Sequence, residues 1–137
     1  MTTTIFLIFH YQILHIYLLK KSQVFYVPIY SNTYNLLHIN CRSLPKNFDS
    51  LCSTIDCINI PFTAIAVTET WLKEHNKDIY AIPGYAFLSN SRLHKIGSGV
   101  GLYINNQLHY KQLADIIFVT ETIECLFVEI LIQGKKI

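Results

Sequence analysis

The chain has 137 residues, of which 51% are hydrophobic and 15% are charged. This length fits one ordinary domain, and the apolar content is sufficient for a sizeable core. The formal net charge is +2. This charge is too small to indicate nucleic-acid binding by itself, because such binding normally requires a clustered basic face.

The first 21 residues form a hydrophobic leader, for which a helix is the candidate structure. Residues 1–19 carry no charge. A membrane span needs about 20 mostly apolar residues, and three polar side chains interrupt this stretch: His10, Gln12 and His15. The basic start and small-residue cleavage site of a secretory signal peptide are also missing. We interpret the leader as an extension that packs loosely or not at all, with membrane insertion through residues 1–19 or secretion as the alternative.

Residues 22–34 form a connector that contains Tyr, Pro and Asn, and the domain spans residues 35–137. Its first strand is expected at residues 36–39, a short apolar run. Between residues 46 and 58 the apolar side chains follow the i, i+3, i+4, i+7 spacing of an amphipathic helix, and Pro45 suits a helix start. The apolar residues of this helix are Phe48, Leu51, Cys52, Ile55 and Ile58.

Residues 63–68 form a continuous apolar run, as expected for a strand buried on both faces. The order strand, helix, strand predicts that this strand pairs in parallel with the first one. Three further segments have β-like composition: residues 85–88, 99–104 and 123–132. The sequence therefore predicts an α/β fold.

A polar side chain stands at the end of each of the first two predicted strands: Asn40 and Glu69. Parallel neighbours end at the same edge of a sheet, where open α/β sheets bind ligands. Mg²⁺ is typically held by one or two protein carboxylates, and an Asn amide can hydrogen-bond a phosphate oxygen or orient a carboxylate. Glu69 is therefore a candidate metal ligand and Asn40 a candidate phosphate contact. By position alone, Glu69 also fits a solvated acid and Asn40 a turn or cap residue.

Basic residues at 92, 94 and 95 precede the sequence Gly97-Ser98-Gly99. Arg92 is suited to a bidentate phosphate contact, although a basic loop also fits plain solvation. The glycines lack both the Walker and the dinucleotide-binding patterns, and they enter a predicted strand, so they indicate a bulge or a close backbone approach. The histidines share no ligand spacing, which favours packing roles for them.

The four cysteines show neither a C-x-x-C pair nor a histidine at zinc spacing, so the pattern gives little support to a structural zinc site. Two of them fall within one predicted helix, which argues against a disulfide framework. We interpret the cysteines as free thiols that are mostly buried, in an intracellular protein.

Six short motifs follow one another along the chain in an order and spacing that resemble the endonuclease domain of LINE-type, non-LTR retrotransposons. This group is a branch of the endonuclease/exonuclease/phosphatase superfamily and is related to apurinic/apyrimidinic endonucleases. The resemblance covers residues 35–130. The motifs are His-Ile-Asn-Cys-Arg-Ser-Leu (38–44), Thr-Glu-Thr-Trp-Leu (68–72), Ile-Pro-Gly-Tyr (82–85), Ser-Arg (91–92), Gly-Ser-Gly-Val-Gly-Leu-Tyr (97–103), and Glu124 with Leu-Phe-Val-Glu-Ile (126–130).

The resemblance implies an α/β sandwich of two sheets that nicks DNA with a divalent metal, usually Mg²⁺, so that the freed 3′ end can prime reverse transcription. It implies that Asn40 helps to position the phosphate and that Glu69 binds the metal, which makes both of them catalytic candidates. Arg92 matches a recurrent Arg of these elements and is a candidate DNA contact. DNA is the implied partner, and the nucleus or the cytoplasm is the implied location.

Later motifs of such domains do not occur in the 137 residues: Tyr-x-Pro-Pro, Gly-Asp-Phe-Asn and Ser-Asp-His. Those motifs supply the water-activating Asp, a phosphate-binding Asn and the His. The expected fold is therefore an incomplete sandwich, roughly its first half, behind a hydrophobic N-terminal segment. A largely absent second sheet predicts an exposed apolar face on the first.

The leading hypothesis is a truncated retrotransposon-type endonuclease domain that is inactive alone. A C-terminal half supplied in trans is a further hypothesis. The alternative from another class is a small non-enzymatic protein that is membrane-anchored or secreted.

Overall fold

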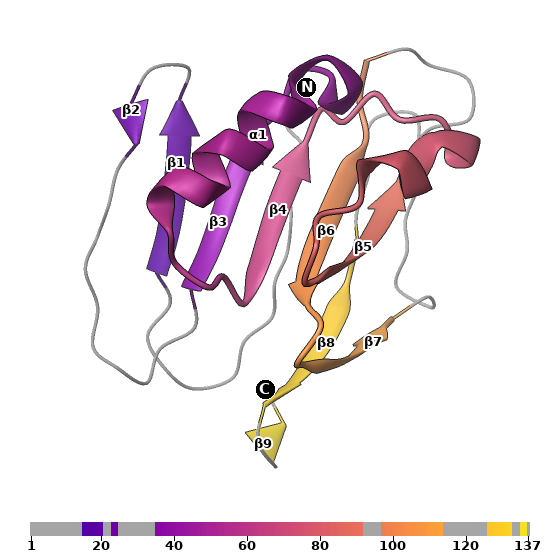
Figure 1. Ribbon diagram of the computed structural model, residues 1–137. Coiled ribbons are helices and arrows are strands. Elements are labelled where there is room, and N and C mark those ends of the chain that lie inside the picture. The colour runs from indigo at the N-terminus through magenta and orange to yellow at the C-terminus, as the bar shows by residue number, and fades with distance from the viewer. Residues whose placement is uncertain are drawn as a thin grey trace.

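The computed structural model describes residues 15–20, 23–24, 35–91, 97–113, 126–132 and 135–136 (Figure 1). These residues form two β-sheets, the helix α1 (Leu44–Ile58) and the short 3-10 helix η1 (Glu74–Tyr80). The strands are β1 (His15–Lys20), β2 (Gln23–Val24), β3 (Asn35–Asn40), β4 (Ala64–Thr68), β5 (Tyr85–Asn90), β6 (Val100–Asn105), β7 (His109–Gln112), β8 (Val128–Ile132) and β9 (Lys135–Lys136).

The larger sheet has the strand order β2-β1-β3-β4-β6-β5, and the smaller sheet has the order β7-β8-β9. Strands β1, β3 and β4 run parallel, whereas β6 runs antiparallel to both of its neighbours, β4 and β5. The predicted α/β composition is confirmed, and so is the parallel pair that the order strand, helix, strand indicated.

The predicted elements of the domain differ from the observed ones by a few residues at their ends. The expected strands at 36–39 and 63–68 are β3 and β4, and every residue of β4 is buried. The helix α1 begins at Leu44 and contains Pro45 in its first turn. It ends where Asn59 adopts a left-handed conformation (φ 53°) and donates its backbone N–H to the Ile55 carbonyl oxygen, 3.2 Å away.

The remaining β-like segments correspond to β5, β6 and β8, and residues 123–125 of the last one lie outside the described residues. The sequence pattern did not reveal β7, whose four residues are all exposed. An exposed edge strand buries no side chain and therefore has no hydrophobic pattern to recognise.

One face of the larger sheet packs against α1, which lies across it in Figure 1. Leu37, Ile65 and Val67 from β3 and β4 form one cluster with Leu51 and Ile55 of the helix. The strand side chains come from alternate positions, because successive residues of a strand point to opposite faces. The helix side chains are four residues apart and therefore lie on one face of the helix. Their burial fixes the helix on the sheet.

The opposite face of the larger sheet packs against the segment that contains β8. Ala64, Leu102 and Ile104 are exposed by only 1%, 2% and 0%, and they share a cluster with Leu126, Val128 and Ile130. The expectation of an exposed apolar face is therefore wrong for these positions. The sequence suggested too little material for a second sheet because the later motifs of such domains do not occur in it, whereas β7, β8 and β9 already form one.

Residues His15–Lys20 form β1, which pairs in parallel with β3 from His15 opposite Asn35 to Leu19 opposite Ile39. This pairing differs from the helical leader that the sequence suggested for residues 1–21. Residues 1–14 lie outside the described residues. Among the helices that the structure describes, none is both long enough and apolar enough to cross a membrane.

We expect Gly101→Ala to lower the free energy of unfolding by about 1–3 kcal/mol, the usual cost of overpacking a core. An added Cβ would lie 2.6 Å from Phe87 Cε2 and 2.8 Å from Val67 Cγ2. Urea denaturation measures the change, and Gln112→Ala on exposed β7 is the control, with an expected effect within about 0.5 kcal/mol. Equal stability of Gly101→Ala and the wild type would contradict this packing.

Candidate functional site

The ends of β3 and β4 bring the two predicted polar side chains together. Asn40, the last residue of β3, lies opposite Thr68, the last residue of β4, and Glu69 follows directly. The Asn40 side-chain nitrogen Nδ2 donates a hydrogen bond to Glu69 Oε1 over 2.9 Å. The prediction that these side chains share one edge of the sheet is confirmed.

Two hydrogen bonds fix the orientation of the Asn40 amide. While Nδ2 donates to Glu69, Oδ1 accepts the backbone N–H of Arg42 at 3.2 Å. This second contact closes a tight turn after β3, as Asn side chains often do. The structure thus combines the two roles considered for Asn40, because the residue that forms the turn also holds the carboxylate.

Asn47 in the first turns of α1 braces the same loop, a role that the sequence did not reveal. Its Nδ2 lies 2.8 Å from the Cys41 carbonyl oxygen, 3.1 Å from that of Arg42 and 3.3 Å from that of Ser43. An Asn within a predicted helix carries no signal for such a contact, because the partners are carbonyls of an irregular loop. The loop that carries Asn40 is therefore tied to the helix.

The backbone of the second motif is held in an unusual conformation. Glu69 and Trp71 have φ angles of 52° and 53°, in the left-handed region that costs a residue with a side chain on the order of 1 kcal/mol or more. The Ser43 N–H donates to the Glu69 carbonyl oxygen over 2.8 Å, and the Trp71 N–H donates to the Ser98 carbonyl oxygen over 2.8 Å. Neighbouring loops on both sides therefore keep Glu69 in place.

Thr70 lies between these two residues and is fully buried. Its N–H donates to the Gly99 carbonyl oxygen over 3.2 Å, and a Cβ at Gly99 would collide with Thr70 Oγ1. Gly99 also has a φ of 108°, which residues with side chains rarely adopt. The close backbone approach predicted for the glycine run is confirmed at Gly99.

His38 lies one strand repeat before Asn40 on β3, on the same face of the sheet. Its Nε2 lies 3.4 Å from Thr68 Oγ1, and the ring is partly buried. Desolvation by burial lowers the pKa of His38, which favours the neutral form of the ring. These contacts agree with the packing role expected from the sequence.

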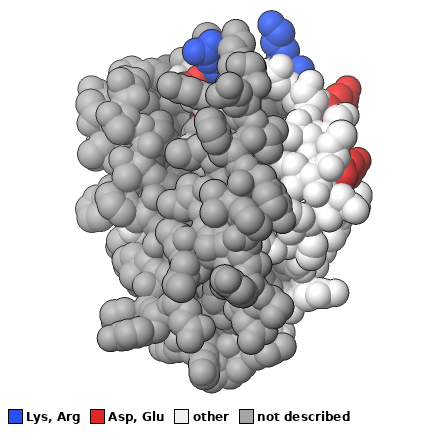
Figure 2. All heavy atoms as spheres, turned by 90° about the vertical axis from the view of Figure 1, so that its left-hand side faces the viewer, with Lys and Arg blue, Asp and Glu red and all other residues white. Residues whose placement is uncertain are grey.

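Exposed basic side chains lie in the segments that adjoin the Asn40–Glu69 pair. Arg42 and Lys73 lie in the loops that follow β3 and β4, and Lys46 lies in the first turn of α1; all three are exposed. Figure 2 shows Lys and Arg side chains at the top of the molecule, the end toward which β3 and β4 run in Figure 1. Such a surface favours an anionic ligand near the carboxylate.

The donors at this edge fit a magnesium ion. Among the described residues, no three His, Cys, Asp or Glu side chains group in a way that could hold a metal. Mg²⁺ does not require such a cage, since it usually keeps several waters and binds through one or two carboxylates together with phosphate oxygens. Glu69 is partly exposed and its carboxylate accepts a hydrogen bond from Asn40, so Glu69 is the residue at this edge that could contribute one such carboxylate ligand.

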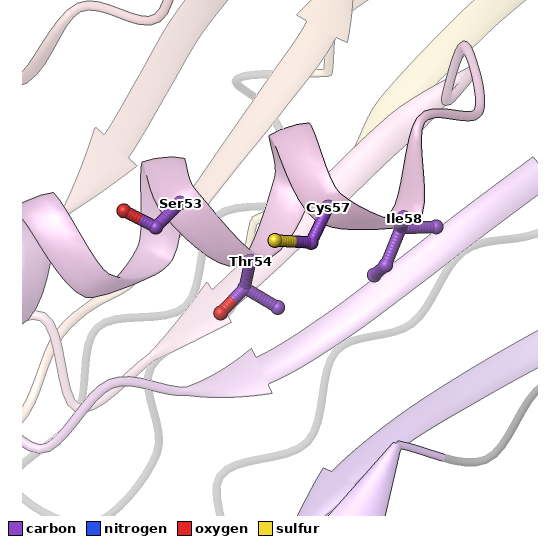
Figure 3. Close-up of a pocket in the computed structure, with 4 residues that line it drawn as sticks. All are labelled: Ser53, Thr54, Cys57 and Ile58. Atoms are coloured by element: carbon purple, nitrogen blue, oxygen red, sulfur yellow. The ribbon is translucent and has the colours of Figure 1, made fainter.

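One predicted site residue is not described, and one depression lies elsewhere on the molecule. Arg92, the candidate DNA contact, lies outside the described residues. A depression of about 430 Å³ on α1 is lined by Ser53, Thr54, Cys57 and Ile58 (Figure 3). These residues belong to the C-terminal part of α1, which leads away from the ends of β3 and β4, and they include no acid or base.

Cys41, the cysteine next to Asn40 in the sequence, does not supply a nucleophile at the edge. Burial raises the pKa of the Cys41 thiol to about 12, which keeps it protonated and unreactive at neutral pH. Cys41, Cys52 and Cys57 are free thiols, as predicted, but only Cys41 among these three is buried and Cys57 is exposed. Cys125 lies outside the described residues.

We expect Glu69→Gly to be more stable than Glu69→Ala by about 1 kcal/mol, because only glycine adopts the left-handed conformation without a Cβ penalty. Both variants lose the carboxylate and its hydrogen bond from Asn40, so their difference isolates backbone strain. Chemical denaturation of the two proteins measures it. If the alanine variant were the more stable one, Glu69 would not be held under strain.

We expect the free energy of unfolding to fall as the pH drops below 6.5, with His38 as one contributor. The His38 pKa is lower in the folded protein than in the unfolded chain, so the unfolded chain binds the proton first as the pH falls. The stabilisation that is present above pH 6.5, the ordinary pKa of the ring, is therefore lost as the pH falls through the His38 pKa of the folded protein. An NMR titration of the His38 ring measures that value directly. The urea-unfolded chain, titrating near 6.5, is the control, and a higher midpoint in the folded protein would contradict the prediction.

Comparison with known proteins identified no relative of this chain. No protein-family model matches this sequence, and no curated protein shows a significant match to it. The function must therefore be argued from the residues and their geometry.

Proposed function

We propose that the edge formed by Asn40 and Glu69 is the metal-binding and phosphate-binding half of a DNA endonuclease site of the LINE type. The observation that carries the proposal is the 2.9 Å hydrogen bond from Asn40 Nδ2 to Glu69 Oε1 at the shared end of two parallel strands. It joins the two residues for which the sequence resemblance implies catalytic roles.

The arrangement of the other motifs supports the same proposal. Backbone hydrogen bonds link the loop after β3 to the Glu69–Trp71 segment, and link that segment to the loop at 97–99. Three stretches that resemble endonuclease motifs therefore meet at one place. Segments that serve packing alone need not converge in this way, whereas the residues of one site must.

In the proposed site, Glu69 binds the divalent cation through its carboxylate. Asn40 keeps that carboxylate oriented, and its amide nitrogen carries a second hydrogen with which it can contact a phosphate oxygen. Mg²⁺, when bound, supplies a Lewis acid that polarises the phosphoryl oxygen. The exposed basic residues around the pair attract the DNA backbone.

The fold that the proposal assigns is an α/β sandwich of the endonuclease/exonuclease/phosphatase type. Its support is the packing of the segment around β8 on the face of the larger sheet opposite α1. Asn40 lies on that inner face by strand alternation, since it follows Leu36 and His38. The proposed site is therefore at the rim of the space between the two sheets.

We further propose that the 137-residue polypeptide does not cleave DNA by itself. Phosphodiester hydrolysis needs a group that activates the nucleophile and groups that stabilise the developing charge. The Gly-Asp-Phe-Asn and Ser-Asp-His motifs that would supply them are not in the sequence. A C-terminal half acting in trans would complete the site, and an intracellular location follows from DNA as the partner.

Binding of Mn²⁺ as a paramagnetic probe for the magnesium site tests the proposal. We expect it to broaden the NMR signals of the Asn40 side-chain amide, because Glu69 would hold the ion next to that group. Glu69→Gln is expected to abolish the effect, whereas Asp56→Asn, the same change at an exposed position of α1, is expected to retain it. An Asn40 amide that Mn²⁺ leaves unchanged would remove the basis for a metal site.

The wild-type chain and Glu69→Ala are tested for cleavage of supercoiled plasmid in the presence of Mg²⁺. We expect no nicking by the wild-type chain, because the activating residues are absent. Robust nicking that Glu69→Ala abolishes would overturn the claim of inactivity while supporting the location of the site.

A further inference from the structure

Trp71 is unusually exposed for its residue type. The side chain has 44% of its surface open to solvent and is one of three large hydrophobic residues in the described parts of the chain that are exposed. Tryptophan is highly buried on average, and its exposure leaves a large apolar surface in water. Its neighbours Thr70 and Leu72 are both buried, so the fold directs this one ring outward.

The backbone that carries the exposed ring is tied to a neighbouring loop. Trp71 has a left-handed backbone (φ 53°) and donates its N–H to the Ser98 carbonyl oxygen over 2.8 Å. Its indole lies against Gly97, where the position of a Cβ would be 3.6 Å from both Cε2 and Nε1. Gly97 therefore lies next to the indole ring.

The position of the ring relative to Glu69 suggests its purpose. The two residues are separated only by Thr70, whose burial contrasts with the partial exposure of Glu69 and the exposure of Trp71. Carboxylate and indole therefore reach solvent from the same short segment. Arg42 and Lys73 are exposed in the adjoining loops, so an anionic backbone that contacts Glu69 would pass beside the ring.

We propose that Trp71 is a stacking platform for an unpaired nucleobase of DNA next to the phosphodiester that the Asn40–Glu69 edge binds. The inference rests on the proposed function and adds a preference to it: DNA in which one base is free to leave the duplex stack. A preorganised aromatic face beside a basic, phosphate-binding edge is the combination that single-stranded nucleic acid requires. Base stacking also gives a physical reason for a strained, exposed tryptophan.

Trp71 is the only tryptophan in the chain, so its fluorescence reports on this ring alone. The first measurement is a titration of the full chain with oligo-dT of about eight nucleotides and with an abasic oligonucleotide of equal length. We expect oligo-dT to quench the emission and the abasic strand, which keeps the phosphates but lacks bases, to leave it nearly unchanged. Equal quenching by both strands would overturn the stacking proposal.

The second measurement is fluorescence anisotropy with a labelled oligo-dT. We expect Trp71→Ala to weaken binding about 10-fold, which corresponds to the loss of one stacked base, and Trp71→Phe to recover part of it. Tyr110→Ala is the matched control, because Tyr110 is an exposed aromatic residue on β7 in the other sheet. Circular dichroism of each variant confirms that the fold is retained.

The outcomes separate the two proposals. If the chain binds oligo-dT but Trp71→Ala binds equally well and the indole is not quenched, the stacking role fails while the endonuclease half-site stands. If the chain binds no DNA and Mn²⁺ leaves the Asn40 amide unchanged, both proposals fail. If oligo-dT quenches the indole but Mn²⁺ leaves the Asn40 amide unchanged, the result would support stacking and count against the metal site.

Discussion

The parallel pairing of β3 with β4 is the constraint on which the rest of this structure depends. It sets Asn40 opposite Thr68, and thereby places the first residue after β4 within hydrogen-bonding distance of the Asn40 amide. A shift of the register by one residue would turn Asn40 toward the α1 face and bury the wrong side of both strands. The buried side chains on both faces of β4 set this register, and the register in turn places Asn40 next to Glu69.

The edge stores strain that the surrounding loops compensate. Arg42, Ser43, Glu69 and Trp71 all have positive φ angles, and each such residue costs on the order of 1 kcal/mol or more. Hydrogen bonds between the three loops, and the Asn47 amide that braces the first of them, hold these conformations. Strain of this kind is typical of positions at which a protein arranges side chains for a ligand.

Most of the core elements followed from patterns in the sequence. The helix α1 could be predicted because its apolar residues recur with the helical period. The strand β4 could be predicted because its sequence is a continuous apolar run. The strand β7 and the pairing of His15–Lys20 with β3 were not predicted. Exposed strand residues show no alternation, and the pairing of β1 depends on a distant strand that the local sequence does not specify.

The sequence by itself determined which residues were candidates: an amide and a carboxylate, each at the end of an apolar strand, and a glycine run that permits close backbone approach. Only the tertiary structure decided that they meet. It also decided that Asn47 braces the loop, that Thr70 is buried under Gly99, and that Trp71 faces solvent. Local sequence encodes chemical type and periodicity, whereas these contacts join segments that are far apart in the chain and come together only through the packing of the sheet.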